Sequence, residues 1–389
     1  MPEPNELLDQ LPAYADALQP LQEMLLTNLV MVGEIPAPTF GEEGRVRFMQ
    51  DRFTEAGLQN VASDEIGNAT AILPGAKGDR NILLVAHADT TFPAAADHTV
   101  NLETGTVSGL SIGRNAMGLA ALMTLPDALG ALGLELDANL ILLGAVRSVG
   151  RGDLAGVRFF LEHSQSPIEA GLSIEGMQLG RLSYSSIGMI RGEIVCQVPE
   201  EYDWTKFGAF SAIQTLNEVI DGLMGIALPR KPRTTIILGQ VEGGRAYDIA
   251  ATEATLRLEV RSEAQDLVED IRARIEDICS EVAAHTGAEV TADFFASRRP
   301  GGMDFSHPLA HYARRVHQAL TIEPRVSSSL SEISAFTDRG IPALRLALTR
   351  GETFKNGRER LEIPPMFKGL AQLVGVLLAI DNGICHEDR

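Results

Sequence analysis

The chain has little cysteine and no long apolar run. Three of its 389 residues are cysteines, Cys196, Cys279 and Cys385, and they are widely separated. This spacing argues against a disulfide framework and against a zinc knuckle, and it fits a reducing compartment, so a cytoplasmic location is expected. No apolar stretch reaches the length that spans a membrane, and the acidic N-terminus, Met1–Glu6, lacks the regions of a signal peptide.

Basic residues are also few. Lys and Arg number 33 against 52 Asp and Glu, which gives a formal net charge of -19. A negative charge of this size argues against nucleic acid or an anionic membrane as the main partner. The hydrophobic share of 45% and the charged share of 22% are ordinary for a soluble globular protein. A chain of 389 residues is too long for one typical core, so two domains are expected.

Apolar strands alternate with helices in the first half of the chain and again near its end. The expected strands cover residues 69–73, 81–86, 139–143, 171–174 and 343–348, and the expected helices cover 16–32, 42–57, 118–129, 154–162, 307–320 and 365–379. This alternation predicts an α/β domain in which a mostly parallel sheet is sandwiched by helices.

Between these two stretches the order changes to β-α-β-β-α-β. The expected strands are 189–198, 234–238, 252–260 and 288–295, and the expected helices are 210–226 and 265–286. Such an order is typical of a ferredoxin-like α+β unit. The prediction is therefore a larger domain, residues 1–188 plus 299–389, with a smaller domain, residues 189–298, inserted into it.

Two polar side chains follow the predicted strand 81–86. His87 and Asp89 are two residues apart, so on a strand they face the same side. The carboxyl end of a strand is where open α/β sheets bind ligands. An imidazole with a carboxylate beside it is typical of metal ligation. A strand end followed by a capped loop is the alternative interpretation.

A series of segments carries a resemblance that covers nearly the whole chain. In order, they are Pro36–Glu43, Asp64–Asn68, His87–Asp89, Ile112–Asn115, Gly118–Ala121, Gly152–Gly156, Ile174–Gly176, Glu242–Gly244 and Arg339–Pro342. Together they resemble the zinc-dependent exopeptidase family that includes peptidase T, glutamate carboxypeptidases, aminoacylases and succinyl-diaminopimelate desuccinylases. The resemblance implies a phosphorylase/hydrolase-like, metallopeptidase-like larger domain with two zinc ions, and an inserted domain that serves as lid and dimerisation domain.

The chain keeps some of the residues that form the zinc centre in the family it resembles. His87 matches the first metal ligand, and Asp89 matches the carboxylate that orients this ligand. Glu175 matches the terminal acidic ligand. One metal position thus keeps two remnant ligands.

Other positions of that centre are replaced. Arg114 falls where the bridging aspartate belongs, and Ser148 and Val149 fall where the general-base glutamate and the next ligand belong. Tyr202 replaces a histidine of the lid, and Lys355 replaces the final histidine ligand. By this resemblance the second metal position keeps no ligand.

The replacements put fixed positive charge where metal ions are expected. A cation within about 4 Å of a metal dication costs several kcal/mol even at an effective dielectric constant near 20. We therefore expect Arg114 to replace the metal and to pair with Asp89 and Glu175, so that no cofactor is bound. Zinc held by His87 and Glu175 is the alternative.

These replacements favour a pseudo-peptidase, which has lost hydrolysis and keeps a cleft for a small molecule or partner. One alternative is a metal-dependent peptidase or amidohydrolase that acts on a dipeptide or N-acyl amino acid. Another is a metal-free enzyme with a cationic cleft, in which Tyr202 lines the rim and Ser148 and Lys355 form a nucleophile–base pair. Ser148 does not lie in a Gly-x-Ser-x-Gly turn, because position 146 is a valine, and this argues against that last interpretation.

Two kinds of partner are expected. Arg114, Arg147 and Lys355 predict a small anionic ligand, because guanidinium and ammonium groups form charge-assisted hydrogen bonds with carboxylates and phosphates. The family resemblance implies a homodimer formed through the inserted domain, with helix 210–226 and strand 189–198 as candidate contacts.

Overall fold

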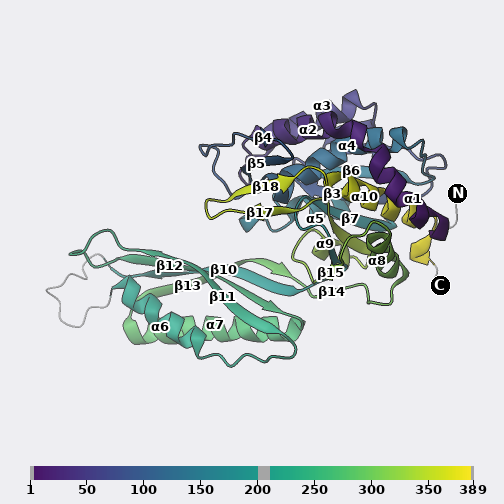
Figure 1. The fold of residues 1–389 in the computed structure, drawn as a ribbon. Coiled ribbons are helices and arrows are strands. Elements are labelled where there is room, and N and C mark those ends of the chain that lie inside the picture. The colour runs from purple at the N-terminus through teal and green to yellow at the C-terminus, as the bar shows by residue number, and fades with distance from the viewer. Residues whose placement is uncertain (1–3, 200–210, 387–389) are drawn as a thin grey trace. The chain divides into compact units, whose positions relative to one another are not determined.

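The chain folds into two units that are discontinuous in sequence. The larger unit contains residues 1–186 and 302–389, and the inserted unit contains residues 187–301 (Figure 1). The structure is a computed structural model that describes residues 4–199 and 211–386.

The larger unit is built on a sheet whose described part has eight strands. Their order is β1-β2-β6-β3-β7-β16-β8-β15. The strands are β1 (Gln59–Ser63), β2 (Ala69–Leu73), β3 (Asn81–His87), β6 (Asn139–Ala145), β7 (Ala170–Glu175), β8 (Arg181–Ser183), β15 (Arg325–Val326) and β16 (Ala343–Ala347). The four central strands, β6, β3, β7 and β16, run parallel to one another. The predicted mostly parallel sheet is thereby confirmed.

Helices cover both faces of this sheet. One face is packed by α1 (Pro4–Ala17), α2 (Gln22–Glu34), α3 (Glu43–Glu55), α4 (Met117–Ala131), α8 (Pro308–Ala319) and α10 (Met366–Asp381). The other face is covered by α5 (Ala155–His163) and α9 (Ile333–Thr337). Strands that are buried on both faces explain why the sequence shows continuous apolar runs here rather than alternation.

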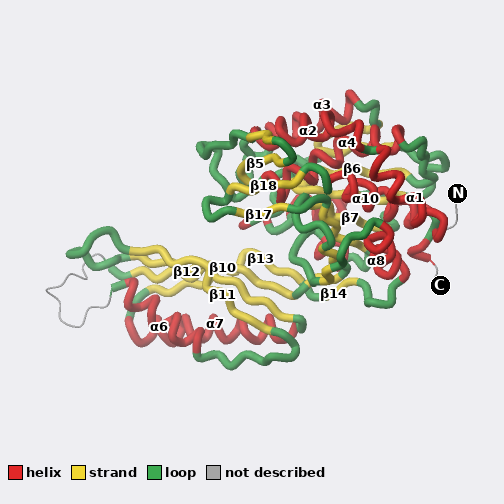
Figure 2. Tube along the Cα trace, in the orientation of Figure 1, coloured by secondary structure: helices red, strands yellow, loops and turns green. Residues whose placement is uncertain are grey.

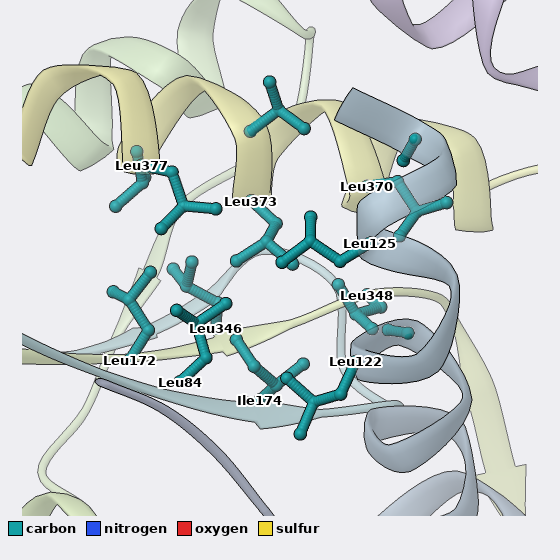
Figure 3. Packing of buried hydrophobic residues seen from close by; sticks show 14 of the residues in the cluster. Leu84, Leu122, Leu125, Leu172, Ile174, Leu346, Leu348, Leu370, Leu373 and Leu377 are labelled. Carbon is teal, nitrogen blue, oxygen red and sulfur yellow. The ribbon is translucent and has the colours of Figure 1, made fainter. Parts of the chain in front are cut away.

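Successive residues of β3 enter different cores. Leu84 lies in the core formed with α4 and α10, whereas Leu83 and Val85 lie in the core formed with α5 and α9. Figure 3 shows leucines of α10, such as Leu373, directed toward leucines of the sheet, such as Leu346. Complete burial of a leucine side chain stabilises the fold by about 2 kcal/mol, so the two cores together hold the central strands in place.

Several elements of the larger unit differ from the prediction, since α1, α9, β1, β8 and β15 were not expected. The expected helix 16–32 is interrupted, because α1 ends at Ala17 and α2 starts at Gln22 after a short turn that contains Pro20. Proline has no N–H to donate to the helical ladder, which explains the break. The unit also contains a second, antiparallel sheet that was not predicted, ordered β17 (Gly351–Thr353), β18 (Arg358–Glu362), β5 (Thr106–Leu110) and β4 (Asn101–Glu103).

The inserted unit has the predicted β-α-β-β-α-β order. Its described strands form an antiparallel sheet in the order β11 (Thr234–Gly243), β12 (Glu253–Ser262), β10 (Gly188–Gln197) and β13 (Glu289–Arg298). The helices α6 (Ala212–Met224) and α7 (Gln265–Thr286) pack on one face of this sheet (Figure 2). The ferredoxin-like inserted unit is therefore confirmed as part of the fold.

The strand predicted as a dimer contact lies in the middle of this sheet. β10 is hydrogen-bonded to β12 along one edge and to β13 along the other. A strand paired on both edges cannot add a strand from a second copy, so β10 cannot form a dimer by edge-to-edge pairing. Among the described residues, no helix of either unit is long and apolar enough to cross a membrane.

A buried histidine makes stability depend on pH. His317 on α8 is fully buried, and its Nε2 lies 2.5 Å from Oε1 of Gln372 on α10. Burial lowers the pKa of His317, so the folded state disfavours the proton that an unfolded histidine accepts below about pH 6.5. We expect the contribution of His317 to the free energy of unfolding to be constant above about pH 7.5 and to fall as the pH drops through 6.5.

Urea unfolding between pH 8 and pH 5.5 measures this dependence. His317→Gln should flatten the curve, whereas His311→Gln, at an exposed position of the same helix, should leave its slope unchanged. Equal slopes in all three proteins would show that His317 does not cause the loss.

Candidate functional site

The candidate site lies at the carboxyl ends of β3, β7 and β16. Val85 of β3 and Arg345 of β16 both pair with Ser173 of β7. Residues aligned across parallel strands share a face, and so do residues two apart on one strand. His87, Glu175 and Arg345 therefore lie on the same face of the sheet, which is the face covered by α5 and α9.

His87 and Asp89 form the predicted pair. The Nδ1 atom of His87 lies 3.3 Å from Oδ1 of Asp89 and 3.1 Å from its backbone oxygen. The Asp89 side chain is completely buried, and its Oδ2 accepts hydrogen bonds from Thr39 Oγ1 and from the backbone N–H of Val149, both at 2.9 Å. The carboxylate thus has a partner on each oxygen.

The charges of this pair stabilise each other. Burial lowers the pKa of His87, but the hydrogen bond to Asp89 and the negative charges of Glu332 and Asp89 outweigh burial, so the pKa is raised. Burial raises the pKa of Asp89, but its bonds to His87, Val149 and Thr39 outweigh burial, so this pKa is lowered. The site therefore favours an ionised Asp89 beside the imidazole.

The start of α3 contributes buried charges next to this pair. Arg45 is fully buried and donates to the backbone oxygens of Ile35 and Ala88, each at 2.9 Å. Glu42 is also buried, and its Oε1 accepts from the backbone N–H of Arg147 at 2.8 Å. Burial lowers the pKa of Arg45 to about 10, and the negative charge of Asp89 offsets part of this shift.

The sequence prediction missed Arg45 and Glu42, although a signal exists. Arg45 lies one turn before Met49 and two turns before Phe53, on the stripe of α3 that the larger core buries. A charged residue within the apolar stripe of a helix is unusual and marks a buried polar contact.

Glu175 is held by an arginine that the sequence prediction also missed. The Nε and Nη2 atoms of Arg345 donate to the two carboxylate oxygens of Glu175, which forms a bidentate ion pair. The side chains are only 7% and 16% exposed, and burial lowers the pKa of Arg345 to about 10. The sequence did contain a signal for this contact, because Arg345 is the single charged residue inside the apolar strand predicted at 343–348.

A second buried carboxylate lies beside this ion pair. Oε2 of Glu332 accepts a hydrogen bond from Ser173 Oγ at 3.0 Å, and Glu332 directly precedes α9. Ser173 is the residue that pairs with Arg345 across the two strands. Glu332 therefore lies at the same strand ends as Glu175 and Arg345.

The predicted pairing of Arg114 with Asp89 and Glu175 is wrong. Arg114 is 64% exposed and donates from Nε to Oε1 of Glu359 at 3.0 Å. The backbone N–H groups of Gly113 and Arg114 donate to the other oxygen of Glu359. The physical reason is the unpredicted sheet, in which β18 brings the buried Glu359 to the turn Ile112–Ala116. Burial raises the pKa of Glu359 and outweighs these bonds.

The other predicted site residues lie in separate surroundings. Ser148 is buried, and its Oγ has no hydrogen-bond partner among the described residues, so the predicted contact with Lys355 is not formed. The guanidinium of Arg147 lies over the ring of Phe40, 5.5 Å from its centroid. Lys355 is exposed in the turn between β17 and β18. Tyr202 lies outside the described residues.

The residues present do not fit a dinuclear zinc centre. Both oxygens of Glu175 are engaged by Arg345, and a guanidinium in this place repels a metal dication. Within residues 4–199 and 211–386, no three His, Cys, Asp or Glu side chains are placed to hold a metal ion. His87 keeps the carboxylate that orients a metal-binding imidazole.

Comparison with solved structures finds the same fold in several peptidases. The dipeptidase Dug1p of Saccharomyces cerevisiae is 12% identical, with a TM-score of 0.79 over 96% of this chain and 99% of the other. A tripeptidase of Staphylococcus aureus is 18% identical, with a TM-score of 0.73 over 93% and 99%. A dinuclear metal-binding peptidase of the M20 family from Bacillus subtilis is 14% identical, with a TM-score of 0.63 over 94% and 99%.

Sequence comparison adds one finding about the inserted unit. The family model described as the peptidase dimerisation domain matches residues 206–287. No curated protein matches the chain. The chain therefore has the fold of the M20 peptidases and carries their dimerisation domain, so the resemblance to zinc-dependent exopeptidases is confirmed.

The ion pair between Arg345 and Glu175 should contribute to stability. Arg345→Met leaves the Glu175 carboxylate largely buried without its cation, and we expect the free energy of unfolding to fall by about 3 kcal/mol. The double variant Arg345→Met/Glu175→Gln should recover part of this loss, since it removes the unpaired charge. Urea unfolding at pH 7 measures both effects.

The matched control is Arg360→Met. Arg360 pairs with Glu352 at 3.5 Å, and the two side chains are 46% and 60% exposed. Loss of such an exposed pair should cost at most about 0.5 kcal/mol. An equally small effect of Arg345→Met would show that the buried pair does not stabilise the fold.

Proposed function

We propose that this chain is a pseudo-peptidase, a protein with the M20 peptidase fold that lacks the dinuclear zinc centre and does not hydrolyse peptides through it. The observation that carries the proposal is the bidentate ion pair of Arg345 with Glu175. This pair occupies the one acidic ligand that the family resemblance retains. A side chain that already neutralises this carboxylate leaves no role for a metal ion there.

The replaced general base supports the same proposal. Hydrolysis by this chemistry needs a side chain that accepts a proton from water near neutral pH. The position holds Ser148, whose hydroxyl is buried and is a poor base. The next position, Val149, contributes only its backbone N–H, which donates to Asp89.

In place of hydrolysis, we propose that the larger unit binds a small anionic ligand or a partner near its strand ends. The half-buried Arg147, two residues after β6, supplies positive charge for this role. Lys355 lies apart, in the turn between β17 and β18, and Arg114 is already paired with Glu359. Anions of the carboxylate or phosphate type match these groups. Thermal shift with a panel of dicarboxylates and phosphate esters tests this part of the proposal.

A metal-dependent peptidase or amidohydrolase is the second candidate, because one observation favours it. His87 retains the carboxylate that orients a metal-binding imidazole, with Nδ1 3.3 Å from Asp89 Oδ1. In this alternative, Arg345 withdraws from Glu175 when zinc binds, and the substrate is a dipeptide or N-acyl amino acid.

Metal content separates the two candidates. Protein purified without chelator, incubated with zinc and dialysed, should retain less than about 0.1 equivalent per chain by elemental mass spectrometry. Dipeptides and N-acyl amino acids should not be hydrolysed faster than by the His87→Ala variant. One or two equivalents of zinc, lost on His87→Ala together with measurable hydrolysis, would establish the second candidate.

We also propose that the chain forms a homodimer through the inserted unit. The match of residues 206–287 to the peptidase dimerisation domain supports this. In the described part of the sheet, β11 is an outer strand, and its Ile237 and Val241 are 36% and 55% exposed. An outer strand with exposed apolar side chains is a suitable surface for pairing about a two-fold axis.

Sedimentation velocity at micromolar concentration tests the dimer. The parent protein should sediment as a dimer, and Val241→Lys should shift it toward monomer, because a charge on each copy would face the interface. Leu102→Lys, at an exposed apolar position of the larger unit, is the matched control and should leave the dimer intact. A parent protein that sediments as a monomer would contradict the proposal.

A further inference from the structure

We propose that Arg345 serves as a permanent internal cation in place of a metal ion, and that its charge is what keeps divalent cations out of the site. The inference rests on the proposed function and deepens it, because it names the residue that excludes metal. The family resemblance pointed to Arg114 for this role, and the structure assigns it instead to a residue in the middle of β16.

The strand register places Arg345 among acidic groups. Arg345 pairs with Ser173 of β7 on one side and with Ser183 of β8 on the other. Glu175 follows Ser173 by two residues and receives two nitrogens of the guanidinium. Ser173 itself donates to Glu332, so Ser173 pairs with Arg345 through its backbone and contacts a second carboxylate, at the start of α9, through its side chain.

These carboxylates require a compensating cation. Glu332 is 2% exposed and Glu175 is 16% exposed at its side chain, so water screens their charge weakly. Arg345 donates two nitrogens to Glu175, and a guanidinium stays charged in proteins. A guanidinium is therefore a fixed charge that does not leave by losing a proton.

The contacts of the guanidinium show that Glu175 determines its position. Nη1 of Arg345 is buried and has no hydrogen-bond partner among the described residues, and the same holds for Oγ of the facing Ser183. The side chain is thus held by the carboxylate rather than by a complete network of neutral hydrogen bonds. Such an arrangement is expected when the site requires the positive charge of Arg345 more than its hydrogen bonds.

With Arg345 in place, no three His, Cys, Asp or Glu side chains of the described residues are positioned to hold a metal ion. Loss of the positive charge would free Glu175 to move toward the other donors. His87, Glu175 and Glu332 come from β3, β7 and the start of α9, and the charge of Glu332 acts on His87. One imidazole and two carboxylates with an open position form a common zinc-binding set. With Arg345 present, the guanidinium satisfies Glu175 and opposes an added dication.

The test compares three substitutions at one position. Arg345→Gln removes the charge but keeps a side chain that hydrogen-bonds to Glu175, Arg345→Ala removes charge and volume, and Arg345→Lys keeps the charge. Zinc binding is measured by equilibrium dialysis and by the shift in Tm with zinc chloride. We expect the Gln and Ala variants to bind about one equivalent at least tenfold more tightly than the parent, with a raised Tm.

Controls locate the gained zinc. Arg345→Lys should behave as the parent, and so should Arg360→Gln, which removes an exposed arginine from an exposed ion pair. Adding His87→Ala or Glu332→Gln to Arg345→Gln should abolish the gain. Far-UV circular dichroism establishes whether each variant is folded. If Arg345→Ala does not fold, the zinc affinity of Arg345→Gln alone tests the inference.

Two outcomes would overturn the inference, and only one of them would also overturn the pseudo-peptidase proposal. A folded Arg345→Gln variant that binds zinc no better than the parent would refute the role of Arg345 in exclusion while leaving the pseudo-peptidase proposal intact. Stoichiometric zinc on the parent protein, with Arg345 in place, would refute both.

Discussion

The parallel pairing of β3, β7 and β16 is the constraint on which the site depends. Register across these strands decides which side chains share a face, and a slip of one residue would move each of them to the opposite core. With the observed register, His87, Glu175 and Arg345 lie together at the strand ends. The apolar residues that alternate with them enter the two cores and hold the register in place.

Buried charge in this molecule is balanced locally. Asp89 is matched by His87 and lies within the electrostatic reach of Arg45, and Glu175 is matched by Arg345. Each of these charges would be costly if left alone in a low-dielectric interior. At the strand ends, the positive charge that balances Glu175 is supplied by the side chain of Arg345.

Many of the elements were predictable because local patterns decide them. The central strands are short apolar runs bounded by turns, and α7 and α10 have clear helical spacing, so their positions follow from the sequence. The sheet of β4, β5, β17 and β18 was missed, because these strands are three to five residues long and several are polar and exposed. Its absence from the prediction is also why the partner of Arg114 was misassigned, since β18 carries Glu359.

The sequence by itself determined that the chain has the peptidase fold with an inserted α+β unit, and that His87 and Asp89 form a pair, because two residues on one strand need no distant partner to face the same side. The tertiary structure alone decided which cation meets which carboxylate. Glu175 is separated from Arg345 by 170 positions, and Arg114 from Glu359 by 245. Contacts over such separations are set by strand order and register, and one sequence does not reveal them when several cations are available to the same acid.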